Sequence, residues 1–112
     1  MPSYMTVARA SAVPPGTATV VNVKGMGIAL FNVKGKFYAL DNTCPHAGFP
    51  LGQSPMFDNL VICIGHGWRF DVTTGECYSV PGATVQMYPL LVEGDEVKIR
   101  EDAIRGEGTI HL

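Results

Sequence analysis

Short apolar runs rich in β-branched residues recur along the chain, and turns containing glycine or proline separate them. Short strands that begin about every eight to twelve residues, with turns between them, are typical of an all-β domain. The pattern predicts strands at residues 4–10, 17–23, 28–33, 37–40, 60–64, 68–72, 76–80, 85–92 and 97–100. No stretch shows the periodicity of an amphipathic helix, although residues 8–13 could form one helical turn before two prolines.

The length of 112 residues predicts a single domain, residues 1–112, because a chain of this size can bury a core without disulfide staples. Hydrophobic residues make up 46% and charged residues 16%, which argues against a disordered chain. The net charge of −2 and the absence of a basic cluster argue against nucleic acid as a partner. No apolar run approaches the roughly 20 residues of a membrane span, and no signal-peptide pattern is visible, so we expect a cytoplasmic protein with no membrane segment.

Two short motifs combine cysteine and histidine in a matched arrangement. Cys44 is followed two residues later by His46, Cys63 is followed three residues later by His66, and 16 residues separate the motifs. Each motif lies at the end of an apolar strand and contains proline or glycine, so strands would hold both loops rigidly. Two thiolates and two imidazoles are the ligand set of a Rieske-type [2Fe–2S] cluster, in which histidines bind one of the two irons.

A zinc site with two cysteines and two histidines is the alternative for this ligand set. Zinc sites usually group their ligands by type, as a cysteine pair followed by a histidine pair. Here each loop carries one residue of each type, which favours the iron–sulfur cluster. With two neutral imidazoles the oxidised cluster is formally neutral, so adding an electron costs less than in a cluster held by four thiolates.

The residues around both motifs resemble those of the soluble Rieske-type ferredoxins, above all the ferredoxin components of bacterial ring-hydroxylating dioxygenases. The similarity rests on segments 42–48, 63–71 and 74–75. It implies the all-β Rieske fold of antiparallel sheets, with a small cluster-binding subdomain at about residues 41–82 and a basal part formed by the remainder. It also implies the ligands of one [2Fe–2S] cluster: for the inner iron Cys44 and Cys63, for the outer iron His46 and His66.

The resemblance further implies an electron carrier rather than an enzyme. The expected partners are an NAD(P)H-dependent ferredoxin reductase, which supplies single electrons, and a terminal oxygenase, which accepts them. The Rieske-like small subunit of assimilatory nitrite reductases is similar in the same motifs, so the large subunit of such a reductase is the alternative partner. We expect a monomer in isolation, and the sequence contains no nucleotide-binding glycine-rich loop.

Four positions near the ligands predict a low reduction potential. High-potential Rieske proteins join the two loops by a disulfide and donate hydrogen bonds to the cluster sulfurs from a serine and a tyrosine. In this sequence Phe49 and Gly65 stand at the disulfide positions, and Trp68 and Phe70 at the hydroxyl positions. Because hydrogen bonds to the sulfurs stabilise the extra negative charge of the reduced cluster, their absence should lower the potential.

Three further features lie outside the ligand set. Cys77 matches no ligand spacing and is expected to be a structural thiol. The segment 80–82 is expected to form a third loop that covers the cluster with Pro81. Small and apolar residues near the histidines, among them Phe49 and Ile64, predict a docking face for a transient redox partner.

Overall fold

The chain forms three antiparallel β-sheets, and the computed structural model describes residues 4–44, 49–65, 67–100 and 102. The first sheet has the order β1 (Tyr4–Arg9), β10 (Glu96–Arg100), β9 (Leu90–Glu93). The second has the order β2 (Ala18–Val23), β3 (Met26–Val33), β4 (Lys36–Asp41), β8 (Met87–Tyr88). The third has the order β5 (Met56–Phe57), β6 (Leu60–Ile62), β7 (Arg69–Asp71). Two 3₁₀ turns complete the described elements, η1 (Ala10–Ala12) and η2 (Leu51–Gln53).

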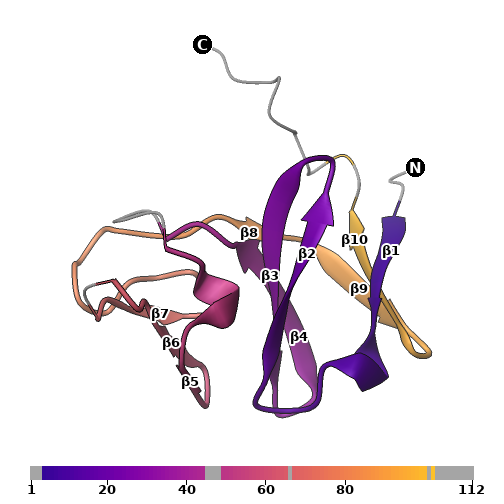
Figure 1. Cartoon of the computed structure of the whole chain (residues 1–112), viewed down its shortest axis with the longest axis horizontal. Helices are drawn as coiled ribbons and strands as arrows, with labels where there is room; N and C mark the ends of the chain where they lie inside the picture. Colours follow the sequence, from indigo (N-terminus) through magenta and orange to yellow (C-terminus); the bar gives the residue numbers. More distant parts are fainter. Residues whose placement is uncertain (1–3, 45–48, 66, 101, 103–112) are drawn as a thin grey trace.

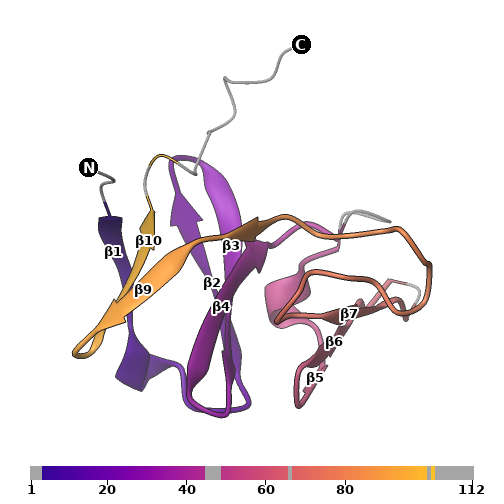
Figure 2. The ribbon, with the colours of Figure 1, turned by 180° about the vertical axis from the view of Figure 1, so that it is seen from behind.

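The three sheets are arranged in two groups. In Figures 1 and 2 the small β5–β7 sheet lies to one side of the two larger sheets, and the chain passes through it between β4 and β8. The prediction of an all-β domain is thereby confirmed, and the expected helical turn is the 3₁₀ turn η1. The described residues contain no helix that is long and apolar enough to cross a membrane.

Two predicted strands differ from the structure. Residues 76–80 form no regular strand, because Cys77 N–H donates to the carbonyl of Ala83 at 3.0 Å and the segment folds back on itself. Only isolated bridges remain there, such as the one between Phe70 and Cys77. The expected strand at residues 85–92 is divided at Pro89 into β8 and β9, which belong to different sheets; proline has no N–H for a continuous ladder. The short strand β5 had no clear sequence signal.

Strand β3 is buried on both faces, since successive side chains of a strand point to opposite sides. Phe31 packs into a group of buried residues that we call the loop-side core, and Leu30 packs into a second group that we call the basal core. The loop-side core comprises Ala29, Phe31, Leu40, Cys44, Leu51, Val61, Cys63, Phe70, Val72, Cys77 and Val85. The basal core comprises Val23, Ile28, Leu30, Ala39, Tyr88, Val97 and Ile99. The second sheet therefore lies between the two cores and contributes side chains to both.

The hairpin turns at 22–25 and 32–35 share the sequence Asn-Val-Lys-Gly. The lysine and the glycine of both turns adopt positive φ, as a type I′ hairpin turn requires. In each turn the asparagine side chain accepts a hydrogen bond from the glycine N–H, at 3.2 Å for Asn22 and 2.8 Å for Asn32. These turns set the register of β2, β3 and β4, and the loop that begins at Cys44 follows β4.

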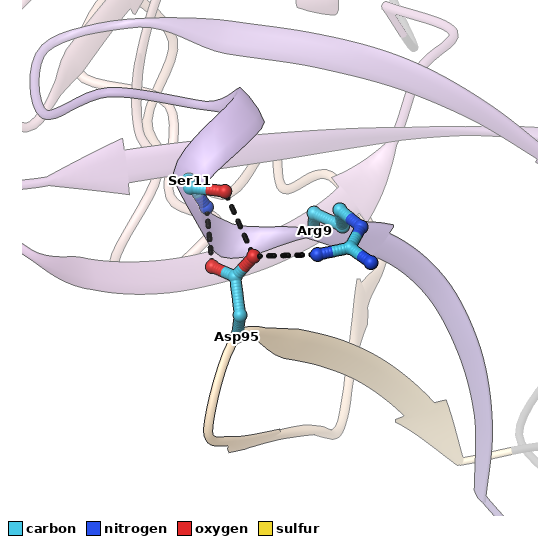
Figure 3. A network of polar contacts seen from close by, with 3 residues as sticks. All are labelled: Arg9, Ser11 and Asp95. Atoms are coloured by element: carbon cyan, nitrogen blue, oxygen red, sulfur yellow. Dashed lines mark hydrogen bonds and ion pairs between the residues drawn. The ribbon is translucent and has the colours of Figure 1, made fainter.

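The turn between β9 and β10 is tied to η1 by the carboxylate of Asp95. Figure 3 shows this carboxylate accepting hydrogen bonds from the N–H of Ser11 at 2.7 Å and its hydroxyl at 2.8 Å, with Arg9 Nη1 at 3.3 Å. The hydrogen bonds from Ser11, together with Arg9, hold the pKa of Asp95 below its ordinary value. The carboxylate therefore stays ionised at neutral pH and fastens the first sheet to the chain entering β2.

The turn η2 fits closely against the second sheet through Gly52. A Cβ at this position would lie 2.5 Å from Cγ2 of Val20 and 3.2 Å from Cβ of Ala29. The N–H of Gly52 donates to Oδ1 of Asn42 at 2.8 Å, and the Asn42 carbonyl accepts from Leu51 N–H at 2.7 Å. Asn42 thus pins the segment after the first ligand loop to the sheet.

Replacing Gly52 with alanine is expected to destabilise the protein by about 1–3 kcal/mol, because the new methyl group would overlap the branched side chain of Val20. Urea unfolding monitored by circular dichroism measures the change. The matched control is Gln53→Ala on the same turn, where the side chain is exposed, and it should change the free energy of unfolding by less than about 0.5 kcal/mol. Equal stability of the Gly52 variant and the wild type would contradict this packing account.

Candidate metal centre

The first loop that the sequence predicts to carry cluster ligands lies between β4 and η2 and begins at Cys44. The N–H of Cys44 donates to the carbonyl of Phe49 at 2.9 Å, and Thr43 forms an antiparallel bridge with Pro50. Thr43 N–H in turn donates to the carboxylate of Asp41 at 2.9 Å. The two ends of this loop are therefore held side by side at the end of the sheet.

The second loop lies between β6 and β7 and is closed in the same way. The N–H of Cys63 donates to the carbonyl of Trp68 at 2.8 Å, and Gly67 N–H donates to the carbonyl of Cys63 at 3.0 Å. Gly67 adopts a φ of 77°, a conformation that favours glycine. In both loops a cysteine N–H thus bonds the carbonyl of an aromatic residue five positions later, so the two loops are structural counterparts.

Both loop cysteines are buried in the loop-side core. Cys44 and Cys63 are each 1% exposed, and neither is in a disulfide. Cys77 is also a buried free thiol of this core, but it lies in the folded-back segment 76–83 rather than in a ligand loop. The prediction of a buried, structural Cys77 fits this position. The structure therefore places the thiols of the two matched loops in one core, which also contains the thiol of Cys77.

Asp71, the last residue of β7, holds the turn that follows this strand, and it was not singled out from the sequence. Its carboxylate accepts hydrogen bonds from the N–H of Thr73 at 2.9 Å, the hydroxyl of Thr73 at 2.6 Å and the hydroxyl of Tyr78 at 2.8 Å. Burial raises the pKa of Asp71, but these hydrogen bonds outweigh it and the pKa lies below its ordinary value. The hydrogen bond that the Tyr78 hydroxyl donates to Asp71 raises the pKa of Tyr78. The Asp-x-Thr spacing, typical of an Asx turn, is the sequence signal that could have identified Asp71.

The donor set fits an iron–sulfur cluster as far as the described residues reach. Two buried thiols in hydrogen-bonded loops would supply soft anionic ligands shielded from water, as iron bridged by sulfide requires. His46 and His66 lie outside the described residues. Within residues 4–44, 49–65, 67–100 and 102, no three histidine, cysteine, aspartate or glutamate side chains form a group able to hold a metal ion.

The family model described as the Rieske [2Fe-2S] domain matches residues 3–89 of this chain. The chain belongs to the Rieske [2Fe-2S] domain family. A Rieske domain holds a [2Fe–2S] cluster, so the predicted cofactor is confirmed at the level of the family. The predicted Rieske fold is confirmed as well, by the family match and by similar solved structures.

Two curated relatives of this chain are ferredoxins of dioxygenase systems. The chain is 34% identical to the ferredoxin component of the naphthalene 1,2-dioxygenase system of Pseudomonas aeruginosa, over 78% of this chain and 85% of the relative. It is 35% identical to the biphenyl dioxygenase ferredoxin subunit of Pseudomonas sp. strain KKS102, over 78% of this chain and 82% of the relative. The prediction of a Rieske-type ferredoxin, an electron carrier of the class found in dioxygenase systems, is confirmed by this similarity.

Two solved structures have a similar fold. A structure described as the complex of reduced oxygenase and oxidized ferredoxin in carbazole 1,9a-dioxygenase matches with a TM-score of 0.81 and 30% identity, over 88% of this chain and 93% of the matched chain. A putative nitrite reductase small subunit matches with a TM-score of 0.78 but 16% identity, over 87% of this chain and 97% of the other. At that identity the second match shows a shared Rieske fold alone.

Proposed function

We propose that Cys44, His46, Cys63 and His66 hold the [2Fe–2S] cluster of this Rieske ferredoxin. When bound, the cluster supplies a one-electron carrier. The observation that carries the assignment is the pair of matched loops, each of which begins with a buried cysteine that is in no disulfide and ends at an aromatic residue. In this arrangement both thiols lie in the apolar loop-side core, which shields them from water.

We further propose that residues 41–82 act as the cluster-binding subdomain and the remainder as its basal support. The third sheet and both ligand loops belong to this stretch, which lies to one side of the other two sheets in Figures 1 and 2. The loop at 80–82 is proposed to cover the cluster, because Val80 and Ala83 pack against the core that contains Cys44 and Cys63, with the exposed Pro81 between them.

The proposed partners are an NAD(P)H-dependent ferredoxin reductase and a terminal oxygenase. Identities of 34–35% to dioxygenase ferredoxins support an oxygenase as the acceptor, and the matched carbazole dioxygenase structure contains an oxygenase together with its ferredoxin. The alternative acceptor is a nitrite reductase large subunit, whose small-subunit counterpart shares the fold at 16% identity. We therefore place a monomeric carrier between reductase and oxygenase.

Single-turnover transfer tests this function directly. The protein is reduced with dithionite, freed of excess reductant, and mixed with the terminal oxygenase or the nitrite reductase large subunit of the same organism. The proposal expects the oxygenase to reoxidise the protein, which is measured as a change in its visible absorption. When O2 and the aromatic substrate of the oxygenase are present, hydroxylated product should form in proportion to the electrons delivered. Reoxidation by the nitrite reductase subunit alone would overturn the proposed partner.

The docking face for the oxygenase is proposed to surround the loop tips. Ile64 is 52% exposed and Phe49 is 40% exposed, and both belong to the ligand loops. Large exposed apolar side chains of this kind favour short-lived contacts between redox partners, which bury less than about 1,200 Å².

The variant Ile64→Asp is expected to slow electron transfer to the oxygenase by about tenfold, since a charge in the contact would cost about 1.4 kcal/mol or more. Stopped-flow absorbance at low protein concentration measures this rate. The control is Phe57→Asp: Phe57 is 62% exposed at the turn end of the β5–β6 hairpin, the end away from Cys63. Equal rates for the Ile64 variant and the wild type would place the docking face elsewhere.

A further inference from the structure

The ring of Phe49 reaches from the first ligand loop to the second and occupies the place of a side chain at Gly65. A Cβ at Gly65 would lie 2.4 Å from Cδ2 and 2.6 Å from Cε2 of Phe49. These distances are shorter than any methyl group tolerates, so the ring edge rests directly on the Gly65 backbone. The contact joins the residue that closes the first loop to the residue that precedes His66 in the second.

The backbone conformation does not explain why a glycine stands at position 65. Gly65 lies outside the left-handed region, whereas its neighbour Gly67 has a φ of 77°. A left-handed conformation is therefore not what requires a glycine at this position. What excludes a side chain at this position is the ring of Phe49.

The aromatic residues that close the two loops behave differently. Trp68 is directed inward, partly buried against the loop-side core, with its ring centroid 6.4 Å from that of Phe70. Phe49 instead crosses to the other loop and remains 40% exposed. The backbone of Phe49 is fixed because its carbonyl accepts the N–H of Cys44 at 2.9 Å. Its ring is thus held over Gly65 by the same loop that carries the first thiol.

We propose that Phe49 and Gly65 form an apolar clasp that holds the two ligand loops together over the cluster. The clasp lies at the two positions where high-potential Rieske proteins carry their disulfide, and none of the three cysteines of this chain forms a disulfide. Phe49 is then a positioning residue: its ring keeps the loops at a constant separation and covers the Gly65 backbone from water. This inference rests on the proposed ligand set, because only that set makes residues 44–49 and 63–68 ligand loops.

A double-mutant cycle between the two positions tests the clasp. The variants are Gly65→Ala, Phe49→Ala and the double variant, each loaded with iron and sulfide to the content of the wild type. The readout is the rate at which visible absorbance is lost under a chelator. We expect each single variant to lose the cluster about tenfold faster than the wild type. In Gly65→Ala the new methyl group displaces the ring of Phe49, and in Phe49→Ala the ring itself is removed, so both changes open the contact. The double variant should lose it no faster than Phe49→Ala alone.

Two further measurements separate a positioning role from a general loss of packing. Phe49→Leu keeps an apolar side chain in the contact and should restore most of the wild-type retention. The midpoint potential should rise in Phe49→Ala, since water admitted to the site stabilises the more negative reduced state. If Gly65→Ala accelerated loss equally with and without Phe49, or if Phe49→Ala left the loss rate unchanged, the clasp would be refuted. Failure of the ligand set would look different, as absence of a Rieske electron paramagnetic resonance signal in the wild type.

Discussion

Replacing either loop cysteine, Cys44 or Cys63, with alanine should abolish cluster binding. Each supplies one of the two proposed anionic ligands, and no other described thiol belongs to a ligand loop. The loss of affinity for iron should exceed the roughly 10–100-fold loss that follows removal of a hydrogen-bond partner of a ligand. The purified variants should therefore contain almost no iron. Iron and sulfide analysis and the visible spectrum of the purified variants measure this.

The control for this experiment is Cys77→Ala. Cys77 is a buried free thiol of the same core, so its replacement removes a similar volume and leaves a similar cavity. This variant should retain a full complement of iron even if its stability decreases. Retention of the cluster in Cys44→Ala, or its loss in Cys77→Ala with the fold intact by circular dichroism, would refute the proposed ligand set.

A redox titration of the wild type should give a midpoint potential near −150 mV, the low end of about −150 to +300 mV for Rieske centres. The positions from which high-potential proteins donate hydroxyl hydrogen bonds are here Trp68 and Phe70, which have no hydroxyl. Phe70 is fully buried in the core that contains both loop cysteines, so no water replaces the missing donor at its ring. A clearly positive potential would contradict this account.

The variant Phe70→Tyr tests the cause of the low potential. A hydroxyl that favours the reduced state by about 1–2 kcal/mol would raise the midpoint potential by about 40–90 mV, given about 59 mV per tenfold change for one electron. The control is Phe57→Tyr, which adds the same hydroxyl to an exposed ring at the far turn of the β5–β6 hairpin and should leave the potential unchanged. Spectroelectrochemistry of both variants measures the two midpoint potentials. An unchanged potential in Phe70→Tyr would contradict the proposed cause.

Local sequence patterns identified most of the strands because their causes are local. Apolar runs with β-branched residues became β2, β3, β4 and β10, and the Lys-Gly pairs between them became hairpin turns with positive φ. The pattern was least informative at residues 76–80 and at β5. There the pairing depends on contacts with distant residues, such as the bond from Cys77 to Ala83, rather than on the segment itself.

The sequence by itself determined the chemical groups available at the proposed site: two thiols and two imidazoles at matched spacing. It also determined that the neighbouring positions lack the cysteines and the hydroxyl groups of high-potential centres. Ligand type and spacing depend on covalent order, so they can be read without a fold. Only the tertiary structure decided that β3 is buried on both faces, that Tyr78 donates a hydrogen bond to Asp71, and that the Phe49 ring rests on Gly65. These are contacts between segments that pack only after the sheets have formed, and no periodicity within either segment encodes them.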